Sequence, residues 1–149
     1  MSPEQIVYLI LITIVPWIEL RGAIPAGILM GMDPLTVFLI SVVTNILVIF
    51  PIYIFLELIF PYFESLPIIQ PILAKIRGKT GKYVDKYGFL GLLIFTAIPL
   101  PGSGAYSACL GAHLLKIRKR DAIPAIALGV IVAGILVTLI SIGFFKLFV

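Results

Sequence analysis

The placement of lysine and arginine is the sequence feature that most constrains how this chain can fold. Four apolar stretches are each long enough to cross a bilayer, which takes about 20 helical residues; they are 6–30, 35–60, 89–113 and 122–145. Two basic clusters, 75–86 and 116–120, flank the third stretch. Short cytoplasmic loops carry an excess of lysine and arginine, so both clusters are expected on the cytoplasmic side. The stretch 89–113 must therefore enter the membrane and return to the same side.

The middle of the stretch 89–113 has a sequence that breaks a helix. It reads TAIPLPGSGAYS and contains Pro99, Pro101, Gly102 and Gly104. Proline removes a backbone donor and clashes with the preceding turn, so a continuous helix ends there. The arms on either side are too short to span a bilayer separately. We therefore predict a re-entrant helical hairpin that enters from the cytoplasmic side.

The composition is that of an integral membrane protein. Of the 149 residues, 61% are hydrophobic and 12% are charged, whereas a soluble domain is about 45–50% apolar and about 25% charged. The first apolar stretch has neither a basic leader nor a small-residue cleavage site, so we expect it to remain in the mature protein. Cys109 is the only cysteine and leaves no intrachain disulfide or thiolate metal site. We expect a single membrane domain over residues 1–149, in a multi-pass protein of the cell membrane.

The first apolar stretch carries two charged residues at a similar interruption. In IVPWIELRGAIPAG, Pro16 and Pro25 bracket Glu19 and Arg21. A charge at mid-membrane costs about 2.5–3.5 kcal/mol on insertion scales. Glu19 and Arg21 would offset this by pairing, but residues two apart do not face each other in a regular helix. We therefore predict a second re-entrant hairpin, with a broken backbone between the two prolines, that enters from the outer side.

These segments predict an all-α membrane protein built from two inverted repeats. Repeat 1, about residues 5–60, and repeat 2, about residues 89–149, each consist of a re-entrant hairpin followed by a transmembrane helix. The tripeptide Ala-Ile-Pro occurs at 23–25 in the first hairpin and at 97–99 in the second. Inverted repeats with broken helices that meet at the midplane are typical of secondary transporters.

A linker of about residues 61–88 joins the two repeats. Its basic, amphipathic part is expected to lie on the cytoplasmic surface, interrupted at Gly78 and Gly81. The basic loops 75–86 and 116–120 are then cytoplasmic and both termini lie outside. In this topology every lysine and arginine except Arg21 and Lys146 is cytoplasmic.

The two hairpin tips form the candidate site. Non-helical backbone at membrane depth needs the shelter of protein or of a water-filled cavity, so the tips are expected to face each other. The predicted substrate- and ion-binding residues are Glu19, Arg21, Pro25, Asn45, Pro99, Pro101, Gly102, Ser103, Gly104 and Tyr106. In one interpretation Glu19 binds a proton or cation and Arg21 binds an anionic group. In the other, the two form a buried ion pair that only fixes the hairpin.

Two motifs resemble a known family. ELRGAIPAGI (residues 19–28) and PLPGSGAYSACLGA (residues 99–112), followed by a basic stretch, resemble the small multidrug export proteins over nearly the whole chain. More distantly, the layout is similar to the DedA (VTT-domain) superfamily, which implies two re-entrant hairpins and the movement of lipids. Glu19 matches the hairpin acidic residue of that superfamily, and Pro101 with Gly102 matches its second-hairpin proline–glycine. The second tip lacks the arginines of members that recognise lipid phosphate.

We expect a secondary transporter, proton- or ion-coupled, that moves an amphipathic small molecule or a lipid head group between the hairpin tips. Glu19 is the expected coupling residue, and Arg21 the substrate or counter-charge contact. An uncoupled lipid scramblase or channel-like conduit is the alternative, and a structural membrane protein is a further one.

Other classes of function are not expected. The sequence has no Ser/His/Asp set, no His/Cys metal cluster and no phosphate-binding Walker loop, so we expect neither an enzyme nor a cofactor. The expected partners are membrane lipids, the substrate and a coupling proton or cation, with no nucleic acid. Two hairpins and two spans make a thin wall around a pathway, so a homodimer is expected as well.

Overall fold

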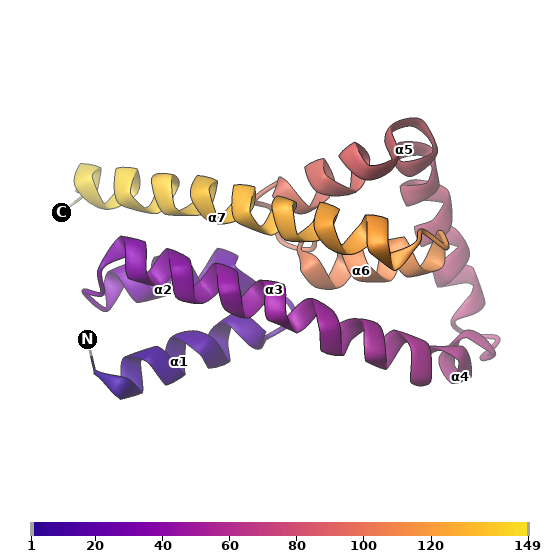
Figure 1. Cartoon of the computed structure of the whole chain (residues 1–149), viewed down its shortest axis with the longest axis horizontal. Coiled ribbons are helices and arrows are strands. Elements are labelled where there is room, and N and C mark those ends of the chain that lie inside the picture. Colours follow the sequence, from indigo (N-terminus) through magenta and orange to yellow (C-terminus); the bar gives the residue numbers. More distant parts are fainter. Residues whose placement is uncertain (1, 149) are drawn as a thin grey trace.

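The computed structural model describes residues 2–148, together with the side chains of all of these except 76, 79–87 and 148. Within this range every regular element is a helix, which confirms the all-α class (Figure 1). The helices are α1 (Pro3–Ile14), α2 (Glu19–Leu29), α3 (Pro34–Leu58), α4 (Phe60–Glu64), α5 (Gln70–Ala97), α6 (Ala105–Leu114) and α7 (Lys119–Phe148). Two of them, α3 and α7, are long and apolar enough to cross a membrane.

The first hairpin consists of α1, a tip at residues 15–18, and α2. A capping box starts α1, because the Ser2 hydroxyl accepts from the Gln5 backbone N–H and the Gln5 side chain accepts from the Ser2 backbone N–H. Pro16 ends α1, since the residue before a proline, Val15, is driven to the extended conformation that it has here. The chain then turns back, and α2 packs against α1.

The second hairpin consists of the last part of α5, a tip at residues 98–104, and α6. Gly88 bends α5 at a positive φ of 50°, so the arm of this hairpin begins there. Ile98 is extended before Pro99, as Val15 is before Pro16. Gly102 turns the tip with a φ of +85°. Both predicted helix breaks are therefore present; the first, predicted between Pro16 and Pro25, lies at residues 15–18, and the second lies at residues 98–104.

Each hairpin leads into a long helix through the same kind of cap. The last turn of α2 ends at Gly31, which has a φ of +76°, and Met32 N–H donates to the Gly27 carbonyl. The last turn of α6 ends at Lys116, which has a φ of +56°, and Ile117 N–H donates to the Ala112 carbonyl. Both are Schellman motifs, which reverse the chain after a helix.

Asp33 caps the first of the two long helices. Its carboxylate accepts from the backbone N–H and the hydroxyl of Thr36, each at 2.9 Å. These two hydrogen bonds lower the pKa of Asp33 below its usual value. The cap is therefore complete at neutral pH and is lost as the pH falls through the lowered pKa.

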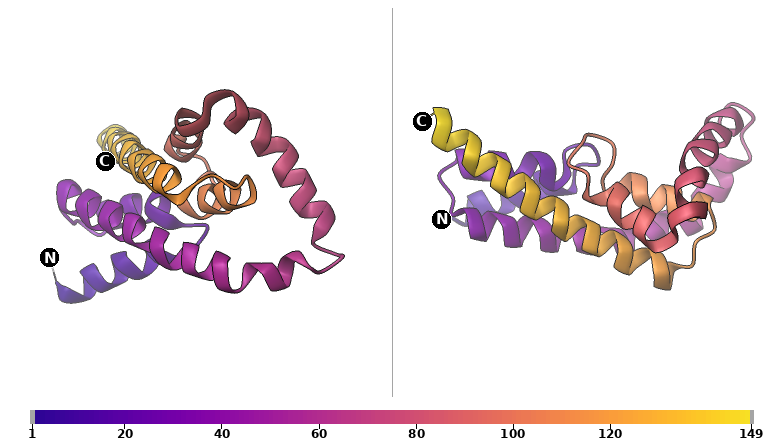
Figure 2. Two further views of the ribbon diagram at one scale, coloured as in Figure 1. Left: turned by 45° about the vertical axis from the view of Figure 1, so that its right-hand side comes forward. Right: turned by 90° about the horizontal axis from the view of Figure 1, so that it is seen from above.

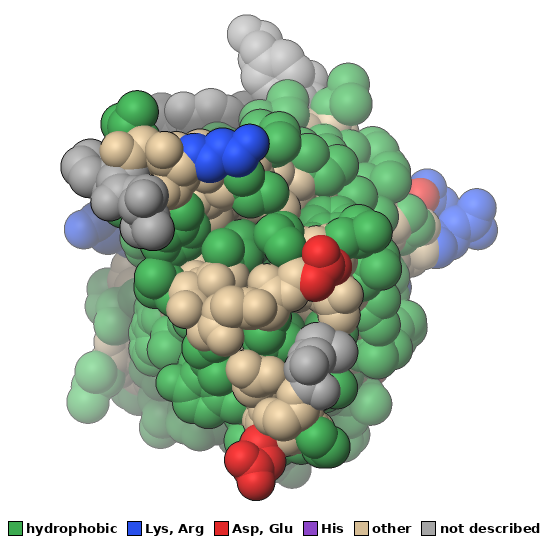
Figure 3. Space-filling view, turned by 90° about the vertical axis from the view of Figure 1, so that its left-hand side faces the viewer, with side chains coloured by type: hydrophobic (Ala, Val, Ile, Leu, Met, Phe, Trp, Pro, Cys, Tyr) green, Lys and Arg blue, Asp and Glu red, His purple; other side chains and the backbone are tan. Residues whose placement is uncertain are grey.

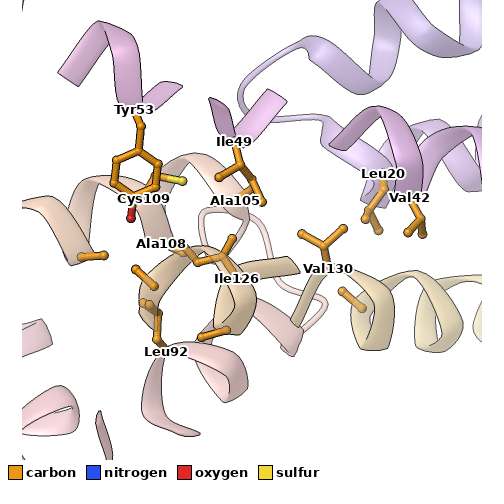
Figure 4. Close-up of a cluster of buried hydrophobic side chains, with 14 of the residues drawn as sticks. Leu20, Val42, Ile49, Tyr53, Leu92, Ala105, Ala108, Cys109, Ile126 and Val130 are labelled. Carbon is orange, nitrogen blue, oxygen red and sulfur yellow. The ribbon is translucent and has the colours of Figure 1, made fainter. Parts of the chain in front are cut away.

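Each half of the chain packs against the other through the second arm of its hairpin. Helix α2 packs on α3 of its own half and on α7 of the other, while α6 packs on α7 of its own half and on α3 of the other. The tips of the two hairpins meet near the middle of the molecule (Figure 2). Ile49, Ala105, Cys109, Ile126 and Leu92 form part of the buried core, which joins α3, α5, α6 and α7 (Figure 4).

Charged side chains gather at one end of the molecule. Helix α4, the first part of α5 and the α6–α7 connection lie together at the end opposite the termini (Figure 1). Three ion pairs lie in these segments or join them to the end of α3: Arg77–Glu64, Lys119–Glu57 and Arg118–Asp121. The end with the termini is mostly hydrophobic, with isolated charged side chains (Figure 3). The segments that carry the two basic clusters thus lie at the same end of the molecule, although the side chains of Lys79, Lys82 and Lys86 lie outside the described residues.

Three sequence expectations about the hairpins and linker are wrong. Pro25 lies inside α2, so it does not bound the first tip. The two Ala-Ile-Pro tripeptides are not equivalent, because 23–25 lies inside the second arm of its hairpin, whereas 97–99 runs from the end of the first arm into the tip. The linker helix is not interrupted at Gly78 and Gly81; α5 continues through both and bends at Gly88. A glycine in a helix lowers its stability without ending it.

Candidate functional site

Glu19 begins α2 in an unusual backbone conformation. Its φ is +49°, a region that costs a residue with a Cβ about 1–2 kcal/mol. The side chain is nevertheless buried, with 4% of the residue exposed. This conformation sends the carboxylate out of the first hairpin and against the second, where a Cβ on Gly104 would overlap both carboxylate oxygens. The absence of a side chain at Gly104 is what allows the two tips to approach.

The Glu19 carboxylate lies at the N-terminus of α6. Its Oε1 accepts from the backbone N–H of Tyr106 at 3.3 Å. The N-cap residue of α6 is Gly104, which provides no side-chain hydrogen bond. Glu19 therefore supplies, from the other hairpin, the acceptor and the negative charge that a helix N-terminus favours.

Arg21 lies at the C-terminus of α5, the other helix end at the second tip. Its Nη1 donates to Glu19 Oε2 at 2.8 Å. Its Nη2 donates to the carbonyls of Thr96 at 2.8 Å, Ile98 at 2.9 Å and Ser103 at 3.3 Å. A guanidinium that satisfies the last carbonyls of a helix also complements the negative end of its dipole. The ion pair predicted from the broken backbone is present, and it neutralises both helix ends at the second tip.

Tyr106 makes the reciprocal contact. Its hydroxyl donates to the carbonyl of Ile14, the last residue of α1, at 2.5 Å. Arg21, near the start of α2, thus binds the end of α5, and Tyr106, near the start of α6, binds the end of α1. We call Glu19, Arg21 and Tyr106 the clasp, because together they join the two tips.

A cavity of about 720 Å³ lies beside the clasp. Its polar lining comes from the clasp residues and from Ser107, with Gly102 and Gly104 of the second tip. Its walls are apolar and are formed by Ile14, Pro16 and Trp17 at the first tip, Val48, Pro51, Ile52, Phe55 and Leu56 on α3, Phe60 on α4 and Leu110 on α6. Trp17 and Phe55 are 81% and 50% exposed, so the cavity opens along the outside of α3.

Five of the ten predicted site residues line this cavity: Glu19, Arg21, Gly102, Gly104 and Tyr106. The other five are placed differently. Ser103 holds the second tip, since its hydroxyl lies within hydrogen-bond distance of the carbonyls of Ile98 and Leu100 and donates its one proton to either. Pro99 and Pro101 shape the same tip, and Pro25 is within α2, one turn beyond Arg21.

Asn45 lies next to the clasp but outside the cavity lining. It is fully buried on α3, with its amide near the Glu19 carboxylate but outside hydrogen-bond distance. Neither its oxygen nor its nitrogen has a hydrogen-bond partner, and the same holds for Ser41 Oγ one turn earlier. Buried polar groups are normally satisfied by protein or water, so these side chains mark a place where water or a ligand would be stabilised.

Sequence reasoning missed the apolar walls and the backbone acceptors. The wall residues on α3 were part of an apolar stretch, which gives the same pattern whether a side chain faces lipid or a cavity. The carbonyls of Ile14, Thr96 and Ile98 have no side-chain signature at all. Their only signal is that a proline follows each of the two helix ends, which leaves those carbonyls without intrahelical partners. Among the described residues, no three His, Cys, Asp or Glu side chains come together as a metal site would require.

The chain matches a known protein family. The family model described as "Putative small multi-drug export protein" matches residues 19–136. No curated protein and no solved structure matches the chain. The matched segment begins at Glu19, directly after the first tip, and contains the second tip, the cavity wall on α3 and the first part of α7.

Proposed function

The chain belongs to the small multi-drug export protein family, and on this premise we propose that it is a secondary transporter of amphipathic small molecules. The observation that carries the proposal is the cavity of about 720 Å³ between α3, α6 and the first tip, with the clasp at its base. Small-molecule sites are typically clefts of about 300–1,000 Å³, mostly apolar, with a few convergent polar groups. The similarity to the DedA superfamily stays a prediction.

In the proposed membrane topology, α3 and α7 cross the bilayer and both hairpins are re-entrant. The position of the basic segments supports this, because the first part of α5 and the α6–α7 connection, which carry the two basic clusters, lie at the end away from both termini (Figure 1). That end is cytoplasmic by the bias of lysine and arginine, and the termini are outside. The two tips then meet inside the membrane, where the clasp satisfies the helix ends that lipid would leave without partners.

Trp17 provides a direct test of how deep the first tip lies in the membrane, because it is the only tryptophan and lies at that tip. In liposomes that contain brominated lipids, we expect bromines near the chain ends to quench Trp17 fluorescence more strongly than bromines near the head groups. A Trp17→Phe, Tyr62→Trp variant is the matched control, since Tyr62 lies in α4 at the charged end and should give the opposite order. Stronger quenching of Trp17 by shallow bromines would contradict the re-entrant topology.

The charges of the site restrict what it binds. Arg21 is held by Glu19 and by three carbonyls, so it acts as the counter-charge and holds the second tip. The paired site has no net charge, and the walls are apolar. The substrate proposed is therefore a molecule with a large apolar body and a polar end that reaches the clasp. Protonation of Glu19 would remove the ion pair, which makes Glu19 the proposed coupling residue.

The transport test replaces Glu19 by glutamine, which keeps the shape of the side chain and removes its charge. In proteoliposomes with an imposed pH gradient, we expect uptake of the amphipathic dye rhodamine 6G to fall by about tenfold or more, because a glutamine cannot exchange the proton. Glu4→Gln is the matched control, since Glu4 is exposed in α1 and should leave uptake unchanged. Normal uptake by a folded Glu19→Gln protein would refute the coupling role.

An uncoupled lipid scramblase is the second candidate. The observation in its favour is the exposure of Trp17 and Phe55 at the mouth of the cavity, where an acyl chain could enter from the bilayer. Dithionite bleaching of a fluorescent-head-group phospholipid in liposomes distinguishes the two. Flip-flop without any gradient, at a rate unaffected by Glu19→Gln, would favour the scramblase.

A further inference from the structure

The helices on either side of the clasp correspond in pairs along the chain. Helices α2 and α6 end at Leu29 and Leu114, and the left-handed cap residues Gly31 and Lys116 follow each at the same distance. Helices α3 and α7 begin at Pro34 and Lys119, again at the same distance. The α2–α3 segment and the α6–α7 segment are therefore related by one constant sequence spacing.

The buried faces of the two long helices, α3 and α7, correspond at the same sequence spacing. Val37 and Ala122, Ser41 and Ile126, and Asn45 and Val130 are corresponding pairs, and all six residues have 0% exposure. Leu56 and Ser141 correspond at 4% and 6% exposure. On the outward face, Phe55 and Ile140 correspond at 50% and 60% exposure. Helices α3 and α7 thus present equivalent faces to the interior.

The interactions of the two tips also correspond at this spacing. Arg21 and Tyr106 are corresponding residues, and each binds the last carbonyls of the first arm of the other hairpin. Helix α6 packs on α3, and its counterpart α2 packs on α7. A feature formed by α3, α6 and the first tip therefore has a defined counterpart position, formed by α7, α2 and the second tip.

We propose that the substrate route consists of two half-sites, the observed cavity and its counterpart between α7, α2 and the second tip, separated by the clasp. This rests on the proposed transport function. The counterparts of the wall residues on α3 are Ala133, Leu136, Val137, Ile140 and Ser141, and those of Ser107 and Leu110 on α6 are Gly22 and Pro25. The counterparts are mainly aliphatic, so the second half-site takes the same apolar class of ligand.

The two half-sites lead to opposite ends of the molecule. The observed cavity extends from the clasp towards Phe60 and α4, at the charged end. Ser141 and Ile140 lie towards the end of α7 that carries the C-terminus (Figure 1). Joined across the clasp, they cover the whole length of the bundle. The clasp is then the barrier between them, which opens when its hydrogen bonds break.

Cysteine labelling tests the second half-site without a substrate. In a Cys109→Ala background, Ser141→Cys is nearly isosteric, and Leu139→Cys is its matched control at a similar depth on the lipid-facing side, where Leu139 is 62% exposed. We expect a membrane-impermeant maleimide added outside to label Ser141→Cys about tenfold faster than Leu139→Cys, because a thiol in hydrocarbon neither ionises nor meets the reagent. Val137→Cys, one turn deeper, should show the same preference. Equal rates at all three positions would overturn the proposal.

The role of the clasp as the barrier is tested with a cysteine in the observed cavity. Leu56→Cys should resist the reagent added outside while the clasp is intact and should react faster once Glu19→Gln weakens it. Labelling of Leu56→Cys from outside at one rate in both backgrounds would overturn the barrier. A failed dye-uptake assay with this labelling pattern intact would contradict the proposed function and leave the route standing.

Discussion

Replacing Arg21 by alanine is expected to destabilise the folded protein by about 3–5 kcal/mol, the loss typical of a buried pair that keeps only one of its charges. The substitution leaves the Glu19 carboxylate buried without its counter-charge and removes a donor from the carbonyls of Thr96, Ile98 and Ser103. Arg21→Lys is expected to recover only part of the loss, because an ammonium cannot reach both the carboxylate and the helix end in the fork geometry of a guanidinium. Thermal unfolding in detergent, followed by Trp17 fluorescence, measures the change.

A double-mutant cycle separates the ion pair from the rest of this effect. Glu19→Gln alone should cost less than Arg21→Ala, because it leaves no uncompensated buried carboxylate and its single oxygen still accepts from either Arg21 or the Tyr106 N–H. The double variant should be more stable than the sum of the two single changes implies, because the uncompensated charge is then absent. An Arg21→Ala protein that unfolds at the same temperature as the wild type would contradict the structural role of the clasp.

The clasp explains why the sequence predicted the site only in part. The helix breaks at Pro16 and Pro99 follow from local chemistry, since a proline acts on its own turn whatever surrounds it. Pro25 has the same chemistry but lies inside α2, where packing against α3 and α7 keeps the helix together. Local rules therefore indicated that a break was present and placed one end of it wrongly.

The sequence predicted the hydrogen-bond partners of Glu19 and Arg21 less well than it predicted the helix breaks. Pairing of the two residues was a hypothesis that needed a distorted backbone, and the positive φ of Glu19 supplies it. The remaining partners are backbone groups of α5 and α6, which any sequence with the same helix ends would offer. Their identity depends on how the tips dock, and that is a property of the tertiary structure.

The structural and the functional interpretation of the ion pair are compatible in this geometry. The clasp holds the two tips together, and this is its structural role. The same hydrogen bonds lie at the base of the cavity, between the two proposed half-sites. A proton on Glu19 would weaken the contact with Arg21 and with α6 together, and so couple protonation to the separation of the tips.

Gly104→Ala is expected to have the second largest effect, because it places a methyl group where the Glu19 carboxylate lies. The backbone of Gly104 has a φ of −82°, which alanine adopts readily, so contact with Glu19 and not backbone strain is the cause. Overpacking of this kind costs about 1–3 kcal/mol. The carboxylate has to move away from the Tyr106 N–H and from Arg21, so dye uptake should fall together with the unfolding temperature.

Two further variants show whether the carboxylate is the group displaced. Gly78→Ala is the matched control, because Gly78 is exposed within α5 with no atom near a new Cβ, and it should gain about 0.5–1 kcal/mol of helix stability. Glu19→Ala combined with Gly104→Ala removes the overlapping group, so this double variant should cost less than the two single changes added together. Additive costs would mean that Gly104 and Glu19 act independently, and the close approach of the two tips would then not depend on the glycine.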